Sequence, residues 1–216
     1  MNAPHNPNPS KILVFGATGG TGRHVIEHAL AAGHHVTAFV RRAGALGPAR
    51  PGLREVVGDV TEPAHVRQAV AGHDAVICAI GAPPSSRDKL RERGTRVIVG
   101  AMQQAGVRRL VCLSSHGIAE SAQELPLLMR WVIVPLVLRR VFDDHEAQER
   151  VVHESGLDWT LVRPPHLSDR PGTGAIDHGL GRVTSMKIPR EDVARFLVAQ
   201  VTDDTYVCAT PFVCAA

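Results

Sequence analysis

The feature that most restricts the fold of this chain is an apolar run followed directly by a glycine-rich turn and a helical pattern. Residues 12–15 read ILVF, and four of the next seven residues, 16–22, are glycine. From there to Gly33, apolar residues recur at the three- and four-residue spacing of an amphipathic helix. A continuous apolar run is typical of a strand that is covered on both faces. The sequence therefore predicts a buried strand, a tight turn and a helix in immediate succession.

Apolar runs and helical patterns go on alternating through the first 115 residues. Further strands are predicted at residues 35–40, 53–58, 74–80, 109–114 and 158–162. Further helices are predicted from Asp59 or Thr61 onward, with Pro63 in the first turn, over 88–105 and over 191–201. Strand–helix alternation implies parallel pairing through right-handed crossovers. We therefore expect an α/β fold, a doubly wound parallel sheet in a single domain spanning residues 11–216, with residues 164–190 forming a loop-rich C-terminal cap.

The composition agrees with one globular domain and excludes several functional classes. A chain of 216 residues with 44% apolar and 21% charged residues is ordinary for a soluble domain, and it is long enough to bury a core without disulfides or a metal. A net charge of +3 without a dense basic run, and an aromatic content of 4%, argue against a nucleic-acid partner. The Asn- and Pro-rich residues 1–10 are expected to form a flexible tail, and they lack the apolar centre of a signal peptide.

An apolar stretch and four cysteines bear on where the protein resides. Residues 125–141 are interrupted by Arg130 and Pro135 and fall short of about 20 clean apolar residues, so no transmembrane segment is expected. A packed helix is the first interpretation of this stretch, and contact with a second copy of the chain is the main alternative. The cysteines form no CxxC pair, and three of them lie in apolar runs, which predicts reduced thiols and a cytoplasmic location.

The glycines of the first turn are placed to bind a diphosphate. Gly16 allows a sharp exit from the strand, Gly19 lets the backbone approach a pyrophosphate, and Gly22 lets the helix lie close to the sheet. Amide groups and the positive dipole at a helix start attract the same anion. A purely structural turn is the alternative. The position of these glycines between the first strand and the first helix favours a nucleotide site instead. The GxxGxxG spacing resembles that of the short-chain dehydrogenase/reductase superfamily.

Residues that follow the next strands complete a predicted nucleotide site. Arg41 and Arg42 end the second strand, where an NAD enzyme places an acid that binds the ribose. Because guanidinium groups match a 2′-phosphate, we expect NADPH rather than NADH, with a solvated basic loop as the alternative. The residues expected beside the adenine and its ribose follow the third and fourth strands: Asp59, Val60, Ile80 and Gly81. Asp59 would also serve as a plain helix cap.

The usual catalytic pair of that superfamily, Tyr-x-x-x-Lys, is absent. Tyr206 is the only tyrosine in the sequence, and position 210 is threonine. Without this base, oxidation of an alcohol is disfavoured, whereas reduction of an electron-poor acceptor remains feasible. Ser114 ends the fifth strand, where the superfamily places a catalytic serine, and Ser115 is the second candidate. A hydrolytic Ser/His site is rejected because Gly-x-Ser-x-Gly is missing.

Longer segments resemble the biliverdin reductase B/NADPH flavin reductase family, in the NmrA-like branch of NAD(P)H-binding proteins. The similar segments are residues 142–145, 151–157, 163–171 and 173–175. The resemblance implies a Rossmann-type fold and NADPH-dependent hydride transfer to a flavin-, quinone- or bilin-like acceptor. It implies that Ser114 faces the reacting ring. We expect solvent, or a group near Ser114 and His166, to supply the proton. Taken with the residues argued above, the expected NADP(H) site comprises Gly16, Thr18, Gly19, Gly20, Thr21, Gly22, Arg41, Arg42, Asp59, Val60, Ile80, Gly81, Arg96, His145, Pro165, His166 and Leu167.

Some features depart from this family or lie outside its function. Residues 125–141 are more similar to bacterial NmrA-type proteins, and His116 stands where the family often has phenylalanine. Because the Tyr-x-x-x-Lys pair is missing, the alternative function is a non-catalytic, NADP(H)-sensing protein of the NmrA type whose apolar helix contacts a partner. Residues 188–194 resemble the superfamily's late helix entry and are interpreted as structural. His24 and His28 have the spacing of metal ligands on a helix but no third ligand, so no metal site is expected.

Overall fold

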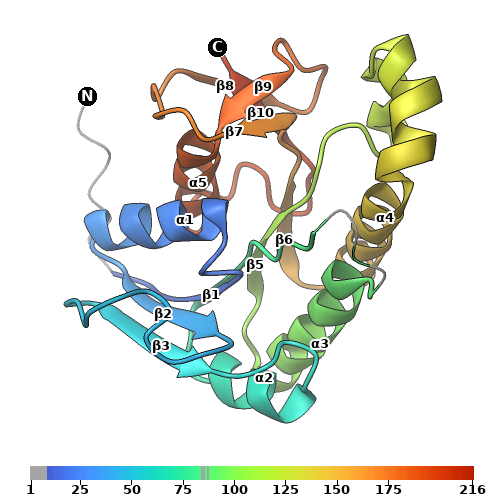
Figure 1. The fold of residues 1–216 in the computed structure, drawn as a ribbon. Coiled ribbons are helices and arrows are strands. Elements are labelled where there is room, and N and C mark those ends of the chain that lie inside the picture. The colour runs from blue at the N-terminus through green and yellow to red at the C-terminus, as the bar shows by residue number, and fades with distance from the viewer. Residues whose placement is uncertain (1–8, 84–85, 87) are drawn as a thin grey trace.

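In the computed structural model, which describes residues 9–83, 86 and 88–216, six parallel strands form one central sheet (Figure 1). The spatial order is β3-β2-β1-β4-β5-β6. The bounds of these strands are Lys11–Phe15 (β1), His35–Val40 (β2), Leu53–Val57 (β3), Ala75–Cys78 (β4), Arg109–Leu113 (β5) and Asp158–Val162 (β6). The predicted doubly wound parallel sheet is confirmed. Residues 1–8 of the predicted tail lie outside the described residues.

Helices cover both faces of the sheet. One face carries α1 (Gly20–Ala31) and α5 (Arg190–Ala199), and the other carries α2 (Pro63–Val70), α3 (Leu90–Ala105) and α4 (Arg139–His153) (Figure 1). The helix α2 begins one residue after Glu62, so the prediction that Asp59 or Thr61 caps it is wrong. The amide and hydroxyl of Thr61 instead donate to Oδ1 of Asp59, at 2.8 and 2.7 Å, and the Asp59 carboxylate stabilises the turn before the helix.

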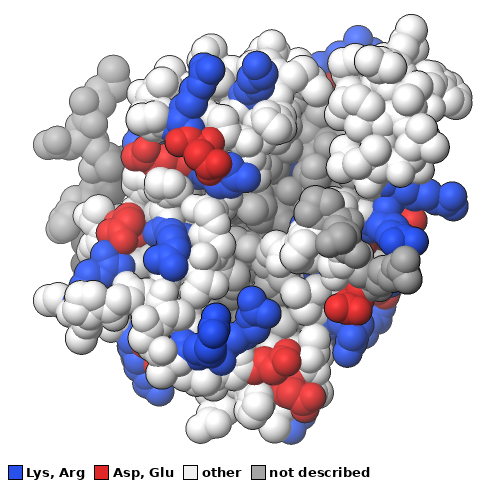
Figure 2. Space-filling view, in the orientation of Figure 1, with Lys and Arg blue, Asp and Glu red and all other residues white. Residues whose placement is uncertain are grey.

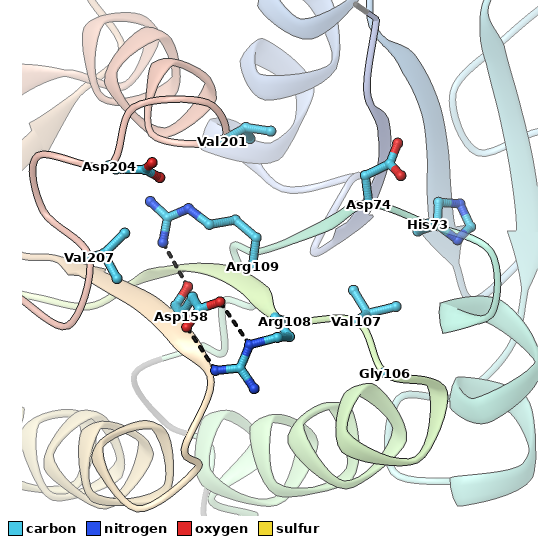
Figure 3. Close-up of a pocket in the computed structure, with 10 residues that line it drawn as sticks. All are labelled: His73, Asp74, Gly106, Val107, Arg108, Arg109, Asp158, Val201, Asp204 and Val207. Atoms are coloured by element: carbon cyan, nitrogen blue, oxygen red, sulfur yellow. Dashed lines mark hydrogen bonds and ion pairs between the residues drawn. The ribbon is translucent and has the colours of Figure 1, made fainter.

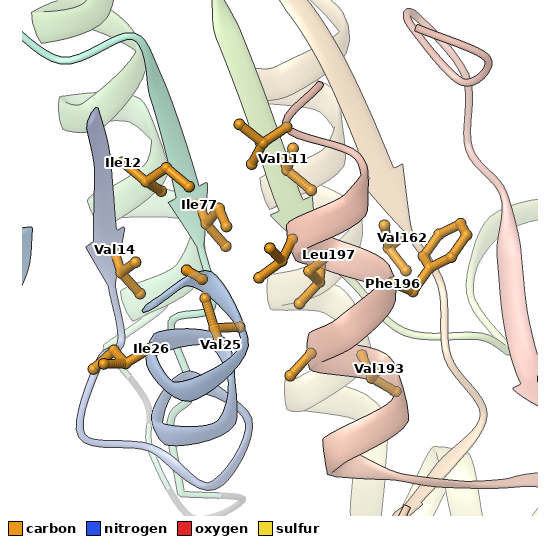
Figure 4. Packing of buried hydrophobic residues seen from close by; sticks show 14 of the residues in the cluster. Ile12, Val14, Val25, Ile26, Ile77, Val111, Val162, Val193, Phe196 and Leu197 are labelled. Atoms are coloured by element: carbon orange, nitrogen blue, oxygen red, sulfur yellow. The ribbon is translucent and has the colours of Figure 1, made fainter. Parts of the chain in front are cut away.

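The two helical layers explain why β1 reads as a continuous apolar run. Ile12 and Val14 point toward α1 and α5, while Leu13 and Phe15 point toward the opposite layer. Figure 4 shows the first of these two cores, in which side chains of β1, β4, β5 and β6 meet those of α1 and α5. All four apolar residues of β1 are fully buried. Burial on both faces removes the polar alternation that a half-exposed strand would show.

A loop-rich cap follows β6, as predicted, and short strands tie it together. The strand β7 (His166–Ser168) pairs with β9 (Lys187–Pro189), and β8 (Ile176–Gly179) pairs with β10 (Phe212–Ala215). The C-terminal strand β10 was not predicted. Asp192 in the first turn of α5 is fully buried and accepts hydrogen bonds from the amides of Thr173 and Gly174, both at 2.9 Å. The helix α5 therefore anchors the cap loop.

The apolar stretch at residues 125–141 projects away from the sheet (Figure 1). A 3-10 turn, η1 (Ala119–Glu124), precedes a π-helical segment, η2 (Met129–Leu138), which continues into α4. All of η2 lies within the described residues and none of its side chains is buried, so its interpretation as a packed helix is wrong. Contact with a second copy stays a prediction. Over residues 9–83, 86 and 88–216, we find no helix with both the length and the apolar character needed to cross a membrane.

Candidate functional site

The carboxyl ends of all six strands meet at one edge of the sheet because the strands run parallel. The strand β1 lies between β2 and β4, so the strand order reverses beside it, and ligands of such sheets bind beyond that point. Figure 2 shows that this face of the molecule is hollowed in the middle. The structure brings to this edge the predicted residues that closely follow a strand: Gly16, Thr18, Gly19, Arg41, Arg42, Asp59, Val60, Ile80, Gly81, Ser114 and Pro165.

Two glycines of the turn after β1, Gly16 and Gly22, have no room for a side chain. Gly16 has a φ of +78°, and a Cβ built on it would lie 2.1 Å from the carbonyl oxygen of Ala79 beyond β4. A Cβ on Gly22 would lie 2.1 Å from the carbonyl oxygen of Gly16. The turn therefore packs tightly against the backbone that follows β4, where the strand order of the sheet reverses. The first turn of helix α1 in the same way packs directly against the glycine turn.

The start of α1 suits a bound anion. Gly19 is the N-cap residue, its amide donates to the Gly16 carbonyl at 2.9 Å, and no described side chain caps the helix. The first turn of α1 contains no acidic residue. Bare amides and the positive helix end are what a diphosphate requires. A Cβ on Gly19 would have only the carbonyl oxygen of Gly16 within 4 Å, at 3.2 Å, so the missing side chain of Gly19 leaves a cradle beside these amides. The residues present therefore fit the diphosphate of a dinucleotide.

Basic and acidic groups lie at the end of β2. Arg41 and Arg42 are exposed, and Figure 2 shows Lys and Arg side chains gathered at this rim of the hollow. The pKa of Asp59 is lowered by hydrogen bonds from Thr61, with the charge of Arg41 acting in the same direction. Asp59 is therefore ionised at neutral pH and lies near Arg41, as the predicted adenine and ribose-phosphate subsites require.

The helix α3 forms one wall of the predicted adenine subsite. A Cβ on Gly94 would lie 3.1 Å from Cδ1 of Ile80 and 3.2 Å from Cγ1 of Val60, so the absence of a side chain lets α3 approach both residues. The role of Gly94 was not predicted. Arg96, two residues further on, pairs with Glu92 at 3.1 Å and is largely exposed, and its role in nucleotide binding stays a prediction.

Ser114 belongs to a buried ion-pair network that sequence reasoning missed. Its hydroxyl donates to Oε1 of Glu149 at 2.6 Å. The guanidinium of Arg163, which follows β6, also contacts Glu149, at 2.6 and 2.8 Å, and pairs with Glu120. Ser114, Glu149 and Arg163 are all buried, and the two carboxylates raise the pKa of Arg163 although burial alone would lower it. The network therefore fixes the direction of the Ser114 hydroxyl.

His145 lies in α4 one turn before Glu149 and is also buried. Burial lowers its pKa to about 3, with the charge of Arg91 acting in the same direction, so the ring is neutral at pH 7. Its Nδ1 atom is buried without a partner among the described residues. The preceding Asp144 accepts hydrogen bonds from the amides of Arg91 and Glu92, at 3.2 and 3.0 Å, and so caps α3 from a distant part of the chain.

The residues after β6 divide between the core and solvent. Pro165 is buried, His166 is exposed at the start of β7, and Leu167 packs partly against the core under α1 and α5. The amide of His166 donates to the carbonyl of Met186 in the cap at 3.2 Å. Ser114 and His166 thus lie at the same end of the sheet in different surroundings, and their joint catalytic role stays a prediction.

A pocket of about 770 Å³ lies at the opposite, amino edge of the sheet (Figure 3). Arg108 donates to both oxygens of Asp158, at 2.8 and 2.9 Å. Arg109 donates to the carbonyl oxygens of Asp158 and Gln200, at 2.8 and 3.0 Å. Since these guanidinium groups already bind the protein, the pocket is a structural crevice and carries none of the predicted site residues.

Comparison with known proteins agrees with the geometry. A family model described as NAD(P)H-binding matches residues 16–204. The chain is 33% identical over 175 residues to an uncharacterised chloroplastic protein of Arabidopsis thaliana, covering 77% of this chain and 62% of that one. It is 32% identical over 199 residues to the (4-alkanoyl-5-oxo-2,5-dihydrofuran-3-yl)methyl phosphate reductase of Streptomyces griseus, covering 88% and 63%. The chain thus spans less than two thirds of the length of each of these relatives.

Solved structures share the fold at low sequence identity. The anaerobilin reductase ChuY of Escherichia coli has a TM-score of 0.79 at 23% identity, with 95% of this chain and 97% of that chain covered. A short-chain dehydrogenase/reductase of Veillonella parvula, solved in complex with NADP, has a TM-score of 0.79 at 19% identity, with 95% and 94% covered. The family match spans the glycine turn, the basic rim and the Ser114 network. The chain therefore belongs to the NAD(P)H-binding family and uses a Rossmann-type sheet to hold a nicotinamide dinucleotide.

Proposed function

We propose that this chain is an NADPH-dependent reductase that transfers hydride to a flavin-, quinone- or bilin-like acceptor. The observation that carries the proposal is the cradle at the start of α1 together with two arginines, and no carboxylate, at the end of β2. The cradle supports dinucleotide binding, and the arginines support recognition of a 2′-phosphate. The missing Tyr-x-x-x-Lys pair favours an acceptor whose reduction needs no strong base.

The chain's own residues would act mainly by binding and orientation. The nicotinamide, when bound, supplies the hydride. Glu149 holds the hydroxyl hydrogen of Ser114, so the oxygen of Ser114 is oriented before any acceptor enters. His145 is neutral at pH 7 because burial lowers its pKa to about 3, so its ring adds no charge. His166 is exposed at the start of β7, and an imidazole that solvent can reach suits the protonation of a reduced acceptor.

The direct test is turnover with a panel of acceptors. We expect steady NADPH oxidation with at least one of FMN, riboflavin, a quinone or a bilin, followed by the absorbance of NADPH. Tight NADPH binding without turnover of any acceptor would contradict the reductase and support the second candidate below.

Cofactor preference gives a second test. We expect Arg41→Ala combined with Arg42→Ala to weaken NADPH binding by about 10- to 100-fold, the value of one or two charge-assisted hydrogen bonds, and to leave NADH binding nearly unchanged. Dissociation constants from calorimetry check this. Arg54→Ala is the matched control, because Arg54 is an exposed arginine that lines a crevice at the opposite edge of the sheet. Equal losses for both cofactors would contradict the assignment of the 2′-phosphate.

A non-catalytic, NADP(H)-sensing protein of the NmrA type is the second candidate. The exposed apolar side chains of Leu127, Trp131 and Leu136 favour it, because such side chains on a surface mark contacts with other molecules. Binding of a partner that changes between NADP+ and NADPH, with no turnover in the acceptor panel, would support the sensor over the reductase.

We also propose a cytoplasmic location. Cys78, Cys112 and Cys214 are buried, Cys208 is exposed, and all four thiols are free. Free thiols are typical of reducing compartments. Fractionation of cells that express the tagged chain tests this proposal.

A further inference from the structure

Arg190, the first residue of α5, lies against the glycine turn. A Cβ built on Gly20 would be 2.8 Å from Cδ and 3.0 Å from Nε of Arg190, so the arginine fills the space that the missing side chain of Gly20 leaves open. Gly20 is the first residue of α1, and its amide is among those that fit a diphosphate. The guanidinium therefore stands beside the positive end of α1.

The fold holds Arg190 at the carboxyl edge of the sheet. The helix α5 packs along α1, and its far end reaches the amino edge, where the carbonyl of Gln200 accepts a hydrogen bond from Arg109 at the start of β5. The first residue of α5 must then lie at the opposite edge, with the glycine turn. Asp169, which follows β7, accepts a hydrogen bond from Nη1 of Arg190 at 2.6 Å. Arg190 thus links the glycine turn to the segment that begins at His166.

The charges around Arg190 are those of an anion site. A guanidinium next to a helix N-terminus adds positive charge to positive charge, which is unfavourable unless an anion lies between them. The other acids of this region are engaged elsewhere: Glu191 accepts from the amide of Gly172, and Asp192 holds the cap loop. Asp169 pairs with Arg190, but its side chain is 87% exposed, so water screens most of that attraction.

We propose that Arg190 binds the diphosphate of the dinucleotide together with the amides at the start of α1. This inference rests on the proposed function, and it replaces the interpretation of residues 188–194 as purely structural. Because NAD+ and NADP+ share the diphosphate, Arg190 contributes equally to both, whereas Arg41 and Arg42 act only on the 2′-phosphate.

Binding measurements with three ligands test the assignment. The variant Arg190→Met keeps an apolar stem over Gly20 but removes the charge. We expect it to bind NADP+ and NAD+ at least 10-fold more weakly and by similar factors, while 2′-AMP, which lacks the diphosphate, binds as to the unaltered protein. Arg195→Met is the matched control, because Arg195 is five residues further along α5 and its guanidinium lies against Gly174 of the cap loop. Calorimetry gives the constants, and circular dichroism verifies folding.

The possible failures are distinguishable. If the unaltered protein binds neither dinucleotide, the proposed function itself is overturned. If it binds both and Arg190→Met binds them equally well, only the role of Arg190 is overturned. A loss confined to NADP+ and 2′-AMP also overturns that role, since it would place Arg190 at the 2′-phosphate. Should the methionine variant not fold, Arg190→Gln removes the charge with a polar side chain, and the same expectations apply to it.

Discussion

At the scale of single residues, His145 combines deep burial with a titratable ring. Its pKa of about 3 in the folded protein lies below the value of about 6.5 for an exposed imidazole. Between these two values the unfolded chain binds one proton that the folded chain does not bind. The free energy of unfolding therefore falls as the pH drops from about 6.5 toward 3. The contribution of the neutral His145 ring to stability is fully present above pH 6.5 and is lost over this range.

We expect His145→Gln to reduce the acid sensitivity of the fold. The unaltered protein should lose about 1.4 kcal/mol of stability per pH unit through this one group over the pH range between the two pKa values. The pKa values of His28, His34, His73 and His116 are also lowered by burial, so part of the acid sensitivity should persist in the variant. Urea denaturation at a series of pH values measures the difference. The same slope in both proteins would mean that His145 takes up its proton without unfolding.

At the scale of elements, local sequence patterns predict strands and helices well, but they do not predict which distant side chains contact them. The first strand and the glycine turn could be predicted because apolar periodicity and glycine spacing act within a few residues. The cap of α3 could not be predicted, because Asp144 supplies it from 52 residues away. The Ser114 hydroxyl likewise meets Glu149 across 35 residues, and only the packing of α4 on the sheet brings them together. The predicted residues that follow strands could therefore be placed at the carboxyl edge from the sequence, whereas the pairing of Ser114 with Glu149 and the contact of Arg190 with Gly20 could not.

The contact between α1 and its turn can be tested with two glycine substitutions. A Cβ at position 22 would lie 2.1 Å from the carbonyl oxygen of Gly16, and that backbone is itself wedged against Ala79. We therefore expect Gly22→Ala to destabilise the fold by about 1–3 kcal/mol through overpacking. A Cβ on Gly100, within α3, would meet no atom within 4 Å.

Gly100→Ala is the matched control and should stabilise the protein by about 0.5–1 kcal/mol, because alanine restricts the unfolded chain and favours the helix. Chemical denaturation of both variants measures these changes. Equal stability of Gly22→Ala and the unaltered protein would show that the turn has more freedom than its contacts indicate.

At the scale of the whole molecule, two regions stand apart: a closed α/β core with its site, and the projecting apolar segment. The core follows from alternation in the sequence, since the apolar runs of β1, β2, β4, β5 and β6 pack against helices on both faces of the sheet. The expectation that residues 125–141 form a packed helix was wrong, because apolar character alone does not say whether a helix is covered by its own chain or by another molecule. The side chains of Leu127, Leu128, Trp131, Leu136 and Val137 are each more than 60% exposed.

We expect this segment to pair with the same segment of a second copy. Burying apolar side chains gains about 25 cal/mol per Å² removed from water, and a two-fold arrangement would cover both copies at once. Light scattering during size-exclusion chromatography should give about twice the 23.2 kDa mass of the chain. Leu127→Glu combined with Leu136→Glu should return it to the mass of one chain with NADPH binding intact, because the glycine turn is a separate part of the fold. Leu180→Glu, an exposed apolar position in the cap, is the control and should leave the dimer unchanged. A single-chain mass for the unaltered protein at every concentration would contradict pairing.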